Sequence, residues 1–140
     1  MRVFLDTNVL ASATAARGLC ADVLREVLAS HSLVSSDAVF AELARVLRED
    51  FGMPPELVSH VLQFLRYGAV IAHPTGHPPA RLKDKDDLPI LSAAIAGSAD
   101  AFVTGDKEIL ALERVGALRI LSPRQFLLAH AAPGRRTKNP

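Results

Sequence analysis

The chain has 140 residues, of which 49% are hydrophobic, and a formal net charge of +1. This length fits one compact domain with a substantial core, and we expect that domain to cover residues 1–132. The near-neutral charge excludes a global basic field for nucleic acid, although basic side chains can still cluster locally. Cys20 is the sole cysteine, which excludes an intramolecular disulfide and a thiolate metal cluster.

The first ten residues do not have the pattern of a cleavable signal segment, and we expect none. Asp6 interrupts the first apolar run before a signal sequence could form, and no apolar run reaches the roughly 18 residues that cross a bilayer. We therefore expect a cytoplasmic protein that does not contact membranes. Residues 133–140 include basic side chains and no large apolar ones, so we expect a disordered basic tail.

Apolar patterns in the first part of the chain predict strands that alternate with helices. The run that ends at Asp6 is rich in β-branched and aromatic residues, which is typical of a buried strand. The small residues over 11–18 predict a connection. Apolar residues at helical spacing then predict a helix over 20–29, and a short strand over 31–35 follows.

Two further helices are expected in the middle of the chain. Ser36 or Asp37 can cap the first of them, which has an apolar stripe over 39–47. Prolines at positions 54 and 55 open the second, where apolar positions over 57–65 predict a buried face. A short strand over 70–72 and a proline-containing loop over 73–79 come next.

The last part of the chain continues the alternation. We expect a helix from Asp86 to Gly97, a strand over 101–104, a short helix over 109–112, a strand over 118–121 and a terminal helix over 123–131. Strands and helices that alternate at this spacing predict a parallel sheet that is covered on both faces.

Acidic residues follow the strands at corresponding places. Asp6 and Asp106 each come at the end of a predicted strand, and the carboxyl ends of parallel strands share one edge of a sheet. The acids between Asp84 and Asp87 open the helix that leads to the second of these strands. Glu42 lies about one and a half turns into its helix. We expect these acids to face one cleft.

Such a group of carboxylates favours a bound cation. Each negative charge raises the pKa of its neighbours and opposes their ionisation, and a divalent ion reverses this effect. Oxygen ligands suit Mg²⁺ or Mn²⁺, and the absence of paired His or Cys argues against zinc and copper. One or two ions could activate a water and neutralise a phosphodiester. Taken singly, each acid could instead be a helix cap or a solvated charge.

Together these motifs resemble the PIN domain, the metal-dependent ribonuclease fold of many bacterial toxins in toxin-antitoxin pairs, the VapC-like toxins. The resemblance extends to about Leu128. The matching pieces are Phe4-Leu-Asp-Thr-Asn-Val9, Ser36 with Ala41-Glu-Leu43, Asp84-Lys-Asp-Asp87 before Leu91-Ser-Ala-Ala94, and Val103-Thr-Gly-Asp-Lys107.

The resemblance implies a three-layer α/β/α sandwich with a central, mostly parallel sheet, and hydrolysis of single-stranded RNA with Mg²⁺ or Mn²⁺. It also implies a homodimer and an antitoxin partner, and the helix over 57–65 could supply part of the dimer surface or pack in the core. By resemblance the metal-binding and catalytic residues are Asp6, Glu42, Asp87 and Asp106. The supporting residues are Asn8, Thr104, the additional acid Asp84, and Asp86, which is the alternative to Asp87.

Other functions remain open at this point. An apolar strand that ends in Asp also opens phosphatases with an aspartate nucleophile, but those enzymes carry an acid two residues later, where this chain has Asn8. A structure-specific DNA nuclease and a non-catalytic RNA-binding module of the same fold are the further alternatives. The presence of all four acids favours an enzyme.

Overall fold

The computed structural model describes residues 1–74 and 87–130, apart from the side chains of residues 87 and 88. Asp84, Asp86, most of the expected loop over 73–79 and the expected tail over 133–140 lie outside the described residues. Within the described ranges, no helix is long and apolar enough to cross a membrane.

Among the described residues, a central sheet joins six strands in the order β3-β2-β1-β4-β6-β5. All neighbouring strands are parallel except β5 and β6, so the expected mostly parallel sheet is confirmed. The strands are β1 (Arg2–Leu5), β2 (Ser32–Ser35), β3 (Val70–Ile71), β4 (Ala101–Val103), β5 (Arg114–Val115) and β6 (Leu118–Leu121).

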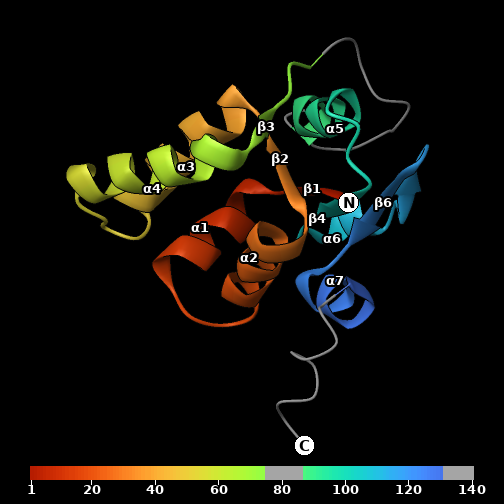
Figure 1. Cartoon of the computed structure of the whole chain (residues 1–140), viewed down its shortest axis with the longest axis horizontal. Helices are drawn as coiled ribbons and strands as arrows, with labels where there is room; N and C mark the ends of the chain where they lie inside the picture. Colours follow the sequence, from red (N-terminus) through yellow and green to blue (C-terminus); the bar gives the residue numbers. More distant parts are fainter. Residues whose placement is uncertain (75–86, 131–140) are drawn as a thin grey trace, which may run out of the picture.

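Helices cover both faces of this sheet, as the three-layer α/β/α expectation requires (Figure 1). On one face lie α1, α2 and α7, and α5 lies on the other. The helices are α1 (Thr7–Ala15), α2 (Leu19–Ser30), α3 (Asp37–Glu49), α4 (Pro55–Gly68), α5 (Asp87–Ala96), α6 (Lys107–Leu110) and α7 (Pro123–His130).

The expected connection over 11–18 was wrong over most of its length, because α1 runs through Ala15. Alanine has the highest helix propensity, and α1 contains three alanines. Its apolar residues Val9, Leu10 and Ala11 are buried, where α1 packs on α2 and α3. The small residues that suggested a connection therefore belong to a helix over most of their length.

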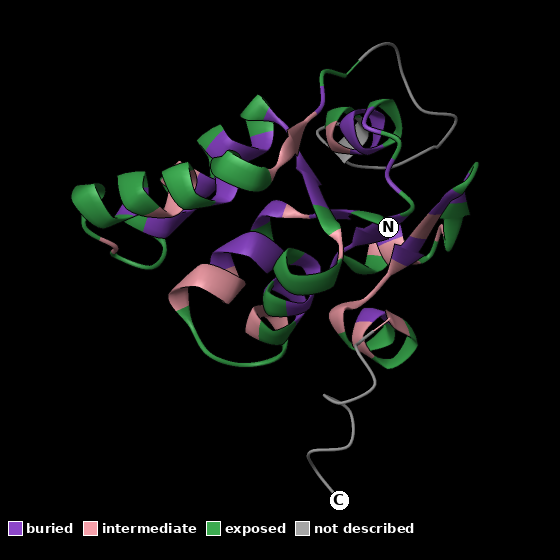
Figure 2. Ribbon diagram, in the orientation of Figure 1, coloured by how far each residue is buried: buried purple, intermediate pink, exposed green. Residues whose placement is uncertain are grey.

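The face expected to be buried on α4 is also smaller than predicted. Val58 and Leu65 are buried, but Leu57 is 48% exposed and Phe64 is 66% exposed. Figure 2 shows the outer surface of this helix as exposed along much of its length. Because α4 packs on α3 at the end of the helical layer, one side of it stays in contact with solvent.

The pairing of β1 with β4 determines which residues meet at the carboxyl edge of the sheet. Phe4 pairs with Phe102, and the two buried rings stack with their centroids 5.4 Å apart. One residue later, Leu5 pairs with Val103. The residues that follow these strands, Asp6 and Thr104, therefore leave the sheet side by side.

Candidate active site

A cleft of about 750 Å³ opens at this edge of the sheet. It lies at the point where the strand order reverses: β2 and β3 are added on one side of β1, and β4 and β6 on the other. Open α/β sheets bind their ligands at such a position. The cleft is lined by Asp6, Thr7, Asn8, Ala38, Val39, Glu42, Pro89, Ile90, Gly105 and Asp106.

Asp6 lies at the junction of β1 and α1. Its backbone N–H donates to the carbonyl of Val103 at 3.0 Å, which continues the pairing of the strands. Its side chain does not cap α1, although Asp6 occupies the cap position. Instead, the hydroxyl of Thr104 donates to Oδ2 of Asp6 at 2.8 Å, so the carboxylate is turned toward β4.

Burial is the main reason that the pKa of the Asp6 carboxyl lies above its ordinary value. The hydrogen bonds from Thr104 and from the backbone of Thr7 act in the opposite direction, and the negative charge of Asp106 adds to the rise. A cation close to Asp6 would favour the ionised carboxylate, because it would offset both the burial and the repulsion.

Thr104 joins the two acids. Its side chain is fully buried, and its hydroxyl accepts a hydrogen bond from the backbone N–H of Asp106 at 3.0 Å while it donates to Asp6. One hydroxyl therefore fixes the end of β4 against the end of β1. The structure thus places this expected supporting residue between the two expected ligands.

Asp106 caps α6. Its Oδ1 accepts from the backbone N–H groups of Glu108 at 2.8 Å and Ile109 at 3.2 Å. This cap explains why α6 begins at Lys107, two residues before the start expected from the apolar pattern. Among the described residues both bonds fall on Oδ1, which leaves Oδ2 available for a ligand.

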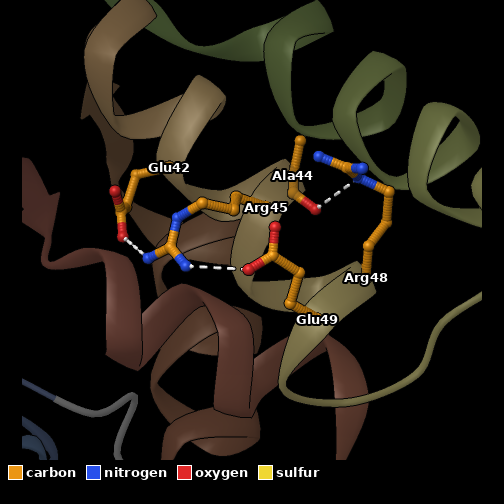
Figure 3. Close-up of polar contacts among 5 residues, drawn as sticks. All are labelled: Glu42, Ala44, Arg45, Arg48 and Glu49. Carbon is orange, nitrogen blue, oxygen red and sulfur yellow. Dashed lines mark hydrogen bonds and ion pairs between the residues drawn. The ribbon is translucent and has the colours of Figure 1, made fainter.

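Glu42 lines the same cleft from α3, which Ser36 caps by accepting from the N–H of Val39 at 3.2 Å. The carboxylate of Glu42 pairs with Arg45, one turn further along the helix, and Arg45 also contacts Glu49 at 3.3 Å (Figure 3). Our sequence reasoning missed this cluster. An acid and an arginine three residues apart on a helix are the signal that could have found it.

The remaining expected residues differ in how far the structure describes them. Asn8 lines the cleft from the first turn of α1. The backbone of Asp87 begins α5, and the same first turn brings Pro89 and Ile90, which were not expected at the site, to the wall of the cleft. The side chain of Asp87 lies outside the description, as do Asp84 and Asp86.

The donor atoms in the cleft suit a hard divalent cation. Asp6, Glu42 and Asp106 offer carboxylate oxygens, which Mg²⁺ and Mn²⁺ prefer, and the described residues of the lining include neither histidine nor cysteine. In the part of the chain that the structure describes, no three His, Cys, Asp or Glu side chains gather closely enough to hold a metal ion.

Taken together, the fold and the cleft define an open α/β/α protein with acids at the carboxyl ends of adjacent parallel strands. Residues 2–108 match the family model of the PIN domain, and the chain belongs to this family. The resemblance found in the sequence is therefore confirmed.

Solved structures with the same fold include VapBC2 from Rickettsia felis, bound to a DNA fragment from its promoter. It is 18% identical, and the match covers 87% of this chain and 98% of that chain with a TM-score of 0.61. VapBC-1 from nontypeable Haemophilus influenzae is 21% identical, with 89% of this chain and 99% of that chain covered and a TM-score of 0.61. A search of curated proteins found no match.

Proposed function

We propose that this protein is an endoribonuclease that hydrolyses single-stranded RNA with Mg²⁺ or Mn²⁺, and that it is the toxin of a toxin-antitoxin pair. The observation that carries the proposal is the arrangement of Asp6 and Asp106, which line one cleft from neighbouring strands and are joined through Thr104. Membership of the PIN domain family supports a nuclease rather than another use of this cleft.

In this proposal Asp6, Glu42, Asp87 and Asp106 hold the cation. When bound, the ion would lower the pKa of a water and neutralise charge on the phosphodiester. Asp6 is half-buried at the wall of the cleft, and Thr104 orients its carboxylate by donating to Oδ2. The cap that Asp106 forms on α6 restricts its side chain in the same way.

The proposal also includes two protein partners. A small antitoxin would block the cleft, and a second copy of the chain would form a homodimer. Both follow from the resemblance to toxins of this family, and the fold that the chain shares with VapBC2 and VapBC-1 supports the first of them.

The activity is tested with a pool of single-stranded RNA, incubated with wild-type protein in Mg²⁺, Mn²⁺ or EDTA. We expect cleavage only with a metal. Asp6→Asn should lower the rate by more than the roughly 10- to 100-fold that follows loss of a residue supporting a metal ligand. Asp22→Asn is the matched control, because Asp22 is an exposed acid on α2 that pairs with Arg25 away from the cleft.

Several results would contradict the proposal. Cleavage in EDTA, or equal cleavage by wild type and Asp6→Asn, would exclude the metal-dependent mechanism. Parallel reactions on single-stranded DNA and on flap DNA decide between substrates, and faster cleavage of either DNA than of RNA would replace the ribonuclease assignment. An RNA-binding protein that cleaves none of these substrates would be a non-catalytic module.

A further inference from the structure

Glu42 differs from the other acids of the cleft in the kind of partner that it has. Asp6 accepts from a hydroxyl and Asp106 accepts from backbone amides, whereas Glu42 contacts a cationic side chain. The Nη2 atom of Arg45 donates to Oε1 of Glu42, and its Nη1 donates to Oε1 of Glu49 at 3.3 Å. Figure 3 shows the guanidinium between the two carboxylates of the same helix.

This cluster is strongly charged but not sealed from water. The guanidinium of Arg45, which is not deprotonated in proteins, contacts the carboxylates of both Glu42 and Glu49. The side chains of Arg45 and Glu42 are each 47% exposed. Solvent screens an ion pair of this kind and makes it weak, so another cation can exchange for the guanidinium.

A guanidinium and a divalent cation would bind the same carboxylate. Glu42 lines the cleft, yet among the described residues it does not gather with two other acids into a metal-binding group. We infer that Arg45 competes with the divalent cation for Glu42, so that this arginine sets the affinity of the free protein for its metal. The inference rests on the proposed function, because it takes the cleft to be a metal site.

Glu49 is a second partner for Arg45 when Glu42 binds the cation. When the cation takes Glu42, Arg45 keeps its contact with Glu49 and its charge is not left without a partner. Glu49 lies one turn beyond Arg45 and does not line the cleft. The two acids therefore differ in role. Glu42 can leave Arg45 and bind the cation, whereas Glu49 stays paired with Arg45.

The test is the affinity of the metal-free protein for Mn²⁺, measured by calorimetric titration without RNA. We expect Arg45→Gln to bind Mn²⁺ about two- to fivefold more tightly than wild type, the range that an exposed ion pair supports. Arg45→Lys keeps the charge without the planar fork and should lie closer to wild type. Because screening weakens exposed pairs, the gain should shrink at high ionic strength.

A matched control separates the contact from the general loss of positive charge. Arg48 lies one turn after Arg45 on the same helix, and its guanidinium donates to the carbonyl of Ala44 at 3.3 Å (Figure 3). Arg48→Gln removes the same charge and should change the Mn²⁺ affinity less than Arg45→Gln. In a Glu42→Gln background, Arg45→Gln should have no larger effect than Arg48→Gln, which isolates the pairwise interaction.

Unchanged or weaker Mn²⁺ binding in Arg45→Gln would overturn the inference and leave the proposed function standing, provided that wild type binds the ion. An equal gain from Arg48→Gln, or a gain that persists in the Glu42→Gln background, would also overturn it. Wild-type protein that binds no Mn²⁺ would overturn both the inference and the metal-dependent function.

Discussion

Two features of Asp6 oppose the ionisation of its carboxyl group in a protein without bound metal. Its carboxylate is partly withdrawn from water, and the charge of Asp106 acts on it from the neighbouring strand end. Thr104 and the backbone of Thr7 compensate for only part of this, so the pKa of Asp6 stays above its ordinary value. The ionised form therefore lowers the stability of the metal-free fold.

The raised pKa of Asp6 predicts that the stability of the metal-free protein falls as pH rises. Because the pKa of Asp6 is raised in the folded state above the ordinary value of 3.8, the stability that this group contributes is full below that value and is lost as pH rises through the raised pKa. Asp6→Asn keeps a hydrogen-bond acceptor for Thr104 but cannot ionise. In urea unfolding without metal, we expect Asp6→Asn to gain stability relative to wild type across this pH range.

The control for this prediction is again Asp22→Asn, whose acid is exposed on α2. Its difference from wild type should not follow the same pH profile. Addition of Mn²⁺ should stabilise wild type more than Asp6→Asn, since a ligand that binds only the folded state adds to its stability. A difference between Asp6→Asn and wild type that stays constant from acidic to neutral pH would contradict the argument.

At the level of single residues, the sequence predicts the positions of Asp6 and Thr104 well, because strand ends follow from the apolar pattern. The partners of Glu42 were not predicted. A helical pattern places Glu42 beside the buried stripe, but the direction of its carboxylate depends on Arg45, which competes with the cleft for it. Side-chain direction on an exposed helix surface depends on such small energy differences.

Among the elements, the helices with a clear apolar stripe and most of the strands were predicted, whereas α1 and β5 were missed. The stripe of α3 is buried as expected, and Ser36 rather than Asp37 provides its cap. In contrast, β5 has two residues and pairs with β6 through a tight turn at Gly116, where φ is 61°. Unlike β3, which was predicted from its apolar run, Arg114–Val115 offers neither an apolar run nor a periodicity, so only the pairing partner reveals this strand.

A substitution at Gly97 tests how closely the end of α5 packs against the sheet. The sequence suggested that this glycine ends the helix, and the structure shows a packing reason: a Cβ here would lie 2.6 Å from Cγ1 of Val34 and 3.0 Å from Cβ of Ala72. Val34 is fully buried in β2 and cannot move aside freely. We expect Gly97→Ala to destabilise the protein by about 1–3 kcal/mol in urea unfolding, as overpacking does.

Gly68, at the end of α4, is the matched control for this substitution. A Cβ at Gly68 would meet nothing within 4 Å, so Gly68→Ala should be neutral or slightly stabilising. If Gly97→Ala were as stable as wild type, the contact between α5 and β2 would have to be looser than the structure shows.

On the scale of the whole molecule, alternation of strands and helices was enough to predict a mostly parallel sheet with covered faces. The strand order was not predicted, because periodicity does not say on which side of β1 a later strand is inserted. That order matters for the cleft, since it places β4 rather than β6 beside β1 and so brings Thr104 to Asp6.

The exposed apolar side of α4 makes the proposed homodimer testable. Phe64 is 66% exposed and Tyr67 is 95% exposed in the single chain. We expect wild type to be a dimer in light scattering coupled to size exclusion, and Phe64→Ser to weaken that dimer about tenfold, which corresponds to about 1.4 kcal/mol. Leu128→Ser, on the surface of α7, should leave the dimer unchanged. A wild type that stays monomeric at high concentration would exclude the homodimer.

The hydrogen bond from Thr104 to Asp6 joins residues that are 98 positions apart. A chain growing on the ribosome exposes Asp6 and Glu42 long before it contains Thr104 and Asp106, and β4 must then pair with β1 before β6 can be added beside it. Domains generally fold as units during synthesis. The cleft is therefore complete only in a nearly finished chain. The proposed ribonuclease would thus lack a complete active site during most of the translation of its own messenger RNA.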